Sequence, residues 1–237
     1  DLEKKFRRSS QEAGEYVGEE KERVLHRNSF LQKIQSWFSS ERGVFVILIA
    51  LALFVRLGYA FFIWRDPLLT TPLHDAKYYL KWAQDILTQG LLGERVFFTE
   101  PLYAYVIALF LKFFGNTGTM ALIIFQWLSG AFVSVGLYLV TKKTLNRPAG
   151  IVTGILGALY APFIFYEGLL LKTSLEVALL PWFLLVLLWA FEKKSPRSFL
   201  LAGIFLGIVS LVKGNNLLFV PVIMGLLWYL LWKIAPL

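Results

Sequence analysis

The sequence predicts an all-α, polytopic integral membrane protein with about six transmembrane helices and two external juxtamembrane helices. Three observations lead to this prediction. Hydrophobic residues make up 57% of the chain, and its mean hydropathy of +0.61 is too high for a soluble domain. The 8 Trp and 10 Tyr suit residues that anchor helices at the membrane–water interface. Cys is absent and there are only 2 His, which excludes thiolate sites and argues against a His-rich metal site.

Residues 1–42 form a charged tail that we expect on the cytoplasmic side. The tail holds nine Lys/Arg and eight Asp/Glu, so its charge is mixed rather than polybasic. Within it, Phe30, Ile34, Trp37 and Phe38 recur at helical spacing. This spacing favours a helix lying on the membrane surface, although the same residues could simply lead into the first span.

Residues 43–237 form the predicted transmembrane module, and charge parity decides how many of its apolar runs span. The runs are 43–64, 101–115, 120–140, 150–165, 169–191, 199–212 and 217–232. The basic loops 142–147 and 192–197 should be cytoplasmic, which requires that run 101–115 does not span. That run has about 15 residues, against roughly 20 needed to cross. We therefore expect six spans and an external segment over 65–118; seven spans with a weak charge bias is the alternative.

This topology gathers ionisable residues on the outer side. They are Asp75, Glu100, Glu167, Lys172 and Lys213, with Arg56 in the outer half of the first span. A charge at that depth costs a few kcal/mol or more unless it finds a partner or water. Six such groups on one face suggest a cleft that handles an anion and a proton.

Asp75 opens a predicted amphipathic helix over 76–89. Its carboxylate suits an N-cap, a general base at the membrane surface, or both, since a cap would fix its orientation. The helix has one apolar face, formed by Tyr79, Trp82, Ala83 and Ile86. The neighbouring His74 is expected to be solvated or interfacial rather than a ligand.

Most of the remaining charged residues carry more than one interpretation. Arg56 could snorkel to the interface, pair with an acid or hold a phosphate bidentately. Lys213 and Lys172 could snorkel at span ends or face the cleft. Glu100 could cap the second juxtamembrane helix, and Glu167 could be a loop acid or a second acid of the site. Within its span, Glu176 is expected to pair with Lys172, one turn away.

Several short motifs, in a fixed order, carry a family resemblance. They are Arg56, the stretch from Leu73 to Ile86, Gly90, Phe97–Tyr105, Tyr160–Tyr166 and Val212–Gly214. Together, over about residues 43–237, they resemble the GT-C glycosyltransferases, most closely the branch of protein O-mannosyltransferases and lipid A aminoarabinose transferases.

The resemblance implies transfer of a sugar from a polyprenyl-phosphate donor to an acceptor on the outer side of a membrane, here expected to be the bacterial inner membrane. It implies that Asp75 activates the acceptor, that Lys213 contacts the carrier phosphate and that Arg56 supports it. Cations should meet the charge that develops on the leaving phosphate, and an acceptor hydroxyl needs a carboxylate within hydrogen-bond reach. Attack opposite the phosphate would invert the anomeric carbon.

Two positions differ from the family pattern. The stretch 171–174 lacks the acid that better-known members carry there, so Glu167 could replace it. Glu100 stands where those members can carry a Lys. A non-catalytic scaffold or lipid-binding subunit is the alternative function, and a lipid or sugar transporter is a third. No metal ligands are assigned, a divalent metal stays open as a cofactor, and no nucleic-acid partner is expected.

Overall fold

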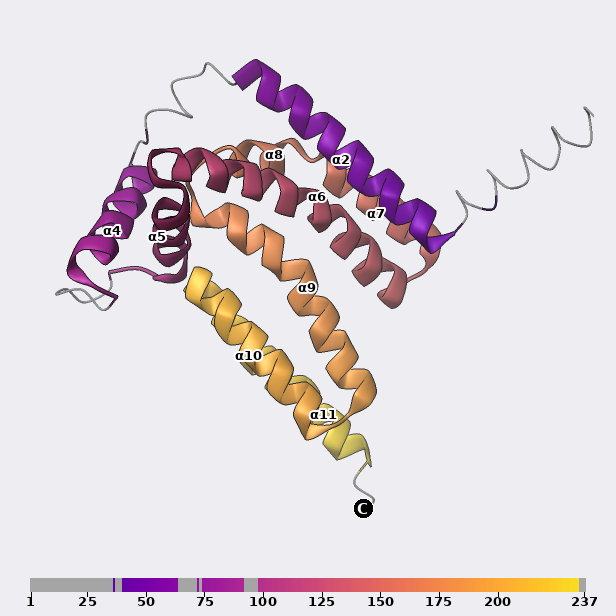
Figure 1. The fold of residues 1–237 in the computed structure, drawn as a ribbon. Coiled ribbons are helices and arrows are strands. Elements are labelled where there is room, and N and C mark those ends of the chain that lie inside the picture. Colours follow the sequence, from indigo (N-terminus) through magenta and orange to yellow (C-terminus); the bar gives the residue numbers. More distant parts are fainter. Residues whose placement is uncertain (1–35, 37–39, 64–71, 73, 92–97, 235–237) are drawn as a thin grey trace, which may run out of the picture. The chain divides into compact units, whose positions relative to one another are not determined.

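The computed structural model describes residues 36, 40–63, 72, 74–91 and 98–234 (Figure 1). The predicted interfacial helix over 29–38 and most of the charged tail lie outside these residues. The chain divides into two units between Ile47 and Leu48, and the description below concerns the second unit, 48–237.

The regular structure in the described residues is helical throughout, as the sequence predicts. The helices, in chain order, are α2 (Glu41–Ile63), α4 (Asp75–Gln89), α5 (Leu102–Phe114), η1 (Gly115–Thr117), α6 (Gly118–Thr144), α7 (Arg147–Leu159), α8 (Ala161–Glu167), α9 (Lys172–Lys193), α10 (Pro196–Val212), η2 (Gly214–Leu218) and α11 (Phe219–Ile234).

Three helical stretches among the described residues are long and apolar enough to cross a membrane. They are α2, the stretch Leu102–Thr144 that contains α5 and α6, and α9. A fourth span results if α7 and α8, which meet at a bend of 47°, are counted as one. The helix α10 and the stretch Gly214–Tyr229 are shorter apolar helices. The chain is therefore an all-α integral membrane protein, and six spans stays a prediction.

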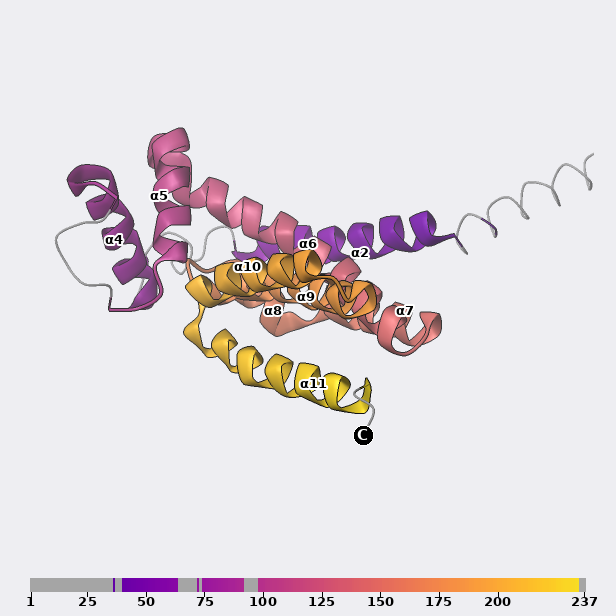
Figure 2. The same cartoon turned by 90° about the horizontal axis from the view of Figure 1, so that it is seen from below.

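Helix α5 differs from the spans in length and direction. Its 13 residues reach about 20 Å, which is less than the roughly 30 Å of a bilayer core. It ends at Gly115, whose φ of +55° favours a residue without a side chain. Figures 1 and 2 show α5 lying beside α4 and turning at η1 into α6, which runs in another direction. This geometry suits the predicted pair of juxtamembrane helices.

The apolar face of α4 joins it to α5 and α6. Tyr79, Ala83 and Ile86 are buried against residues of these two helices, and Trp82 is partly buried beside them. The predicted apolar face of this helix is therefore confirmed. Its packing fixes the start of α4 near the start of α9, because Tyr79 interacts with Lys172.

The two basic loops meet at the opposite end of α9. Lys143, near the end of α6, donates a hydrogen bond of 2.7 Å to Glu192, in the last turn of α9. The loops 142–147 and 192–197 thus lie at the same end of the helices. Lys172, the first residue of α9, marks the other end, where α4 and α5 lie.

Candidate functional site

The most deeply buried charges are Arg56 of α2 and Glu167 of α8. The Arg56 guanidinium donates two hydrogen bonds of 2.6 Å, one to each carboxylate oxygen of Glu167, and the two side chains are 1% and 3% exposed. The remaining guanidinium nitrogen donates to the carbonyls of Ala52 and Ala158. The two side chains therefore satisfy each other's charge inside the protein.

Neighbouring residues shape the space around Glu167. A Cβ atom at Gly130 would lie 2.0 Å from a Glu167 carboxylate oxygen, so only glycine leaves room for this acid. The Gln126 amide donates to the carbonyls of Glu167 and Leu169, at 2.8 and 2.9 Å, and accepts a hydrogen bond of 2.7 Å from the Tyr103 hydroxyl. Through these bonds, α6 holds the turn between α8 and α9.

A second group of charges lies where α9 begins, next to the start of α5. Lys172 donates to the carboxylate of Glu100 and, at 3.2 Å, to the Thr99 hydroxyl. Glu100 also accepts 2.7 Å and 2.6 Å bonds from the Thr99 hydroxyl and the backbone N–H of Gly214. Burial alone would raise the pKa of Glu100, but these hydrogen bonds outweigh burial and lower that pKa to about 2. The acid is therefore ionised at neutral pH.

Lys213, between α10 and η2, extends this group. Its ammonium donates a 2.9 Å bond to Glu176, which also accepts a longer one, of 3.4 Å, from the Asn216 amide. The expectation that Glu176 pairs with Lys172 is wrong. Lys172 turns instead towards Glu100, on the loop before α5, and this leaves Glu176 to Lys213. We call these residues the polar cluster: Thr99, Glu100, Lys172, Glu176, Lys213, Gly214 and Asn216.

Asp75 is the first residue of α4 and not its N-cap, which corrects the predicted helix start. The N-cap is His74, with φ +46°, and no side chain caps the helix there. The Asp75 carboxylate is exposed and makes no hydrogen bond or ion pair to any residue that the structure describes. The helix dipole favours an acidic residue in the first turn of a helix. This interaction accounts for the position of Asp75 even though its carboxylate has no partner among the described residues.

The predicted site residues therefore fall into three places. The structure brings Glu100, Lys172 and Lys213 together in the polar cluster, with Tyr79 in contact with Lys172. Asp75 and His74 lie one turn before Tyr79, both exposed. Arg56 and Glu167 form their own buried pair. Their roles in binding and catalysis stay predictions.

Several further residues organise these places although the sequence did not predict their roles: Thr99, Gln126, Gly130, Gly214 and Asn216. Gln126 gave a usable signal, because an amide within an apolar run needs partners inside the protein. Thr99 and Gly214 lie within the motifs that carry the family resemblance, but their partners, like those of Gly130 and Asn216, come only from tertiary contacts. Among the described residues no group of three or more His, Cys, Asp or Glu side chains is placed to hold a metal ion.

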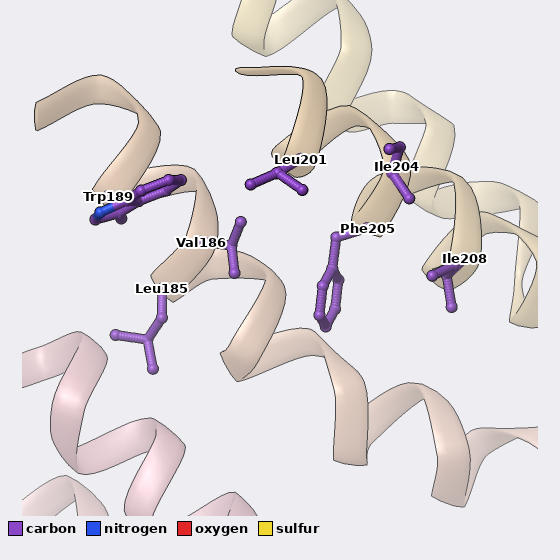
Figure 3. Close-up of a pocket in the computed structure, with 7 residues that line it drawn as sticks. All are labelled: Leu185, Val186, Trp189, Leu201, Ile204, Phe205 and Ile208. Atoms are coloured by element: carbon purple, nitrogen blue, oxygen red, sulfur yellow. The ribbon is translucent and has the colours of Figure 1, made fainter. Parts of the chain in front are cut away.

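An apolar groove of about 460 Å³ lies apart from these charges, between α9 and α10 (Figure 3). The side chains that line it are Leu185, Val186, Trp189, Leu201, Ile204, Phe205 and Ile208. None of the predicted site residues lines the groove, and its walls offer nothing to bind a charge. The polar cluster and Asp75 are therefore the better candidate for chemistry.

The hydrogen-bond donors of the polar cluster are of the types that bind phosphate. Two ammonium groups, a hydroxyl and a backbone N–H converge at one end of the helices, and such donors suit phosphate oxygens. Asp75 begins α4, one turn before Tyr79, and offers a carboxylate with no partner among the described residues. The arrangement can hold an anion and accept a proton, the two tasks of a transferase whose leaving group is a phosphate.

Comparison with known protein families agrees with this chemistry. The model of the dolichyl-phosphate-mannose-protein mannosyltransferase family matches residues 99–235, more than half of the chain. The match covers α5 to α11 and with them the whole polar cluster, whereas Arg56 and Asp75 precede it. No curated protein and no solved structure matches the chain. The chain thus belongs to the dolichyl-phosphate-mannose-protein mannosyltransferase family, and it is a membrane glycosyltransferase of the GT-C type.

Proposed function

We propose that this protein moves a sugar from a polyprenyl-phosphate donor to an acceptor hydroxyl on the outer side of the membrane. The observation that carries the proposal is the convergence of Lys172 and Lys213 with the Thr99 hydroxyl and the Gly214 N–H. The exposed acid Asp75 begins the helix whose Tyr79 interacts with Lys172. The family supports a sugar donor linked to a polyprenyl phosphate.

The ion pair between Lys143 and Glu192 supports the orientation. It joins the two basic loops at one end of α9, and basic loops favour the cytoplasmic side. The polar cluster lies at the other end of α9, beginning at Lys172, and so belongs outside. In a bacterial cell this orientation corresponds to the outer face of the inner membrane, with the charged tail in the cytoplasm.

The proposed reaction needs no covalent intermediate with the protein. Asp75 accepts the proton of the acceptor hydroxyl, whose oxygen forms a bond to the anomeric carbon of the sugar. The bond between that carbon and the phosphate oxygen breaks, and the electron pair leaves with the polyprenyl phosphate. Lys213 and Lys172 stabilise the charge that develops on this phosphate. Attack from the face opposite the phosphate inverts the anomeric carbon.

Other predicted site residues have supporting roles in this scheme. The Arg56–Glu167 pair ties α2 to α8, and the turn that follows α8 leads into Lys172. Tyr79 connects α4, and hence Asp75, with the ammonium of Lys172. His74 sits exposed beside Asp75, where it can contact the acceptor but is not needed as a base.

Asp75→Asn tests the proposal. The change removes the proton acceptor while keeping the shape of the side chain, so transfer from a polyprenyl-phosphate sugar should fall about 100-fold or more. Asp85→Asn, on the same helix, is the matched control and should keep transfer near the level of the parent protein. Both variants should unfold at the same denaturant concentration as the parent.

Undiminished transfer by Asp75→Asn would contradict the catalytic role of this acid. Complete absence of transfer by the parent protein, with stable association to other membrane chains, would favour the alternative of a non-catalytic scaffold. Flux of a lipid or sugar without covalent transfer would favour the transporter.

A further inference from the structure

We infer that Lys172, Thr99 and the Gly214 N–H form a binding site for the phosphate of the donor, and that the carboxylate of Glu100 occupies this site as an internal competitor. The phosphate displaces Glu100 when it binds. The identity of the anion rests on the proposed function, whereas the competition rests on the contacts of Glu100.

Three donors from three separate segments converge on Glu100. They are the Lys172 ammonium at the start of α9, the Thr99 hydroxyl at 2.7 Å and the Gly214 N–H at 2.6 Å. An ammonium, a hydroxyl and a backbone N–H differ in chemistry, but all of them donate to anionic oxygens. A phosphate group presents several such oxygens and can use the same donors. The carboxylate thus marks a place built to hold an anion.

Glu100 can leave this place without disrupting a helix. It lies on the loop before α5, and its side chain is 26% exposed, as is 24% of the Lys172 side chain. Gly214 contributes no side chain of its own, so its N–H is reached directly, and a Cβ atom there would lie 3.0 Å from the Glu100 carboxylate. By contrast, Glu167 is 3% exposed and enclosed by Arg56, so it could not be exchanged for an external anion.

The net charge of the polar cluster determines how strongly Glu100 opposes the binding of a phosphate. Two lysines, Lys172 and Lys213, face two acids, Glu100 and Glu176, so the four charges sum to zero. A phosphate that approaches this neutral group gains little net attraction unless one acid moves away. The low pKa of Glu100, about 2, keeps the competitor charged at neutral pH. Return of Glu100 to Lys172 would then help the polyprenyl phosphate product to leave.

Glu100→Gln tests the inference on the intact chain in detergent micelles, with farnesyl monophosphate as the probe. Removing the competing charge while keeping the side-chain volume should tighten binding about tenfold, since a nearby like charge then no longer opposes the phosphate. Glu100→Asp keeps the charge but shortens the side chain, and it should give an intermediate affinity. Glu192→Gln removes an acid that pairs with a lysine at the other end of α9, and it should not change the affinity.

Two further probes define the ligand. If the site recognises phosphate alone, inorganic phosphate should rank the parent protein, Glu100→Asp and Glu100→Gln in the same order of affinity as farnesyl monophosphate does. If the lipid contributes to binding, inorganic phosphate should bind much more weakly. Farnesol, without the phosphate, should bind the Glu100→Gln variant and the parent protein equally. Lys172→Gln should weaken phosphate binding both in the parent protein and in the Glu100→Gln variant.

Unchanged or weaker phosphate binding by a folded Glu100→Gln variant would overturn the inference, because Glu100 would then be only a structural partner of Lys172. No phosphate binding by either protein would overturn it as well. The proposed function is tested separately, by sugar transfer. Loss of transfer in Asp75→Asn with intact phosphate binding would support the function even where the competition fails.

Discussion

The buried ion pair and the two ion pairs of the polar cluster differ in their surroundings, and this difference separates a contact of the fold from contacts of the proposed site. Arg56 and Glu167 are almost completely buried and joined by two bonds of equal length. The side chains of the Lys172–Glu100 and Lys213–Glu176 pairs are 13% to 37% exposed, lie at helix ends and make single bonds between the charged groups. The first kind cannot exchange partners without opening the helix bundle, whereas the second can.

The residue types agree with this division. A planar guanidinium matches a carboxylate bidentately and remains charged when buried, which suits a permanent contact between α2 and α8. An ammonium on a flexible stem is a point charge that can turn from one acceptor to another. Lysines are therefore the better choice where an incoming phosphate must be bound and released in each reaction cycle.

The largest expected effect comes from breaking the buried pair. Glu167→Gln leaves the Arg56 charge uncompensated in a dry environment and should lower the free energy of unfolding by about 3 to 5 kcal/mol. The matched change Glu192→Gln breaks the exposed pair with Lys143 and should cost at most about 1 kcal/mol. Unfolding of both variants in mixed detergent micelles measures the difference. Equal losses of unfolding free energy in the two variants would show that the cost of breaking these ion pairs does not depend on their burial.

A smaller loss is expected from crowding the same pair. In Gly130→Ala the added methyl group would lie 2.0 Å from the Glu167 carboxylate, so the acid or α6 must shift. Such overpacking should cost about 1 to 3 kcal/mol of unfolding free energy. Gly203→Ala is the control, because its Cβ meets nothing within 4 Å on α10. A Gly130→Ala variant as stable as this control would contradict the close fit around Glu167.

Much of the fold could be predicted because it depends on periodicity and composition. The helical membrane class, the apolar face of α4 and a short helix at 101–115 all follow from local patterns. Pairing with an acid was one of three alternatives for Arg56, and nothing local distinguished it from the other two. The sequence also placed the start of α4 one residue late, since either His74 or Asp75 can precede the first turn.

The partners within the polar cluster could not be predicted, for a physical reason. Lys172 and Glu176 are one turn apart, and helical spacing alone favours their pairing. The loop before α5 brings Glu100 to Lys172, and the exit of α10 brings Lys213 to Glu176, so tertiary contacts replace the local one. The two pairs join residues that are 72 and 37 positions apart, and no pattern in a single sequence reports such contacts.

The most direct test of the account is an experimental structure of the intact protein with a bound polyprenyl monophosphate. The phosphate should lie within hydrogen-bond distance of Lys172 and Lys213, with Glu100 displaced. Asp75 should face the same space, and the Arg56–Glu167 pair should be unchanged. A phosphate bound at Arg56, or bound elsewhere while Lys172 still contacts Glu100 and Lys213 still contacts Glu176, would contradict it.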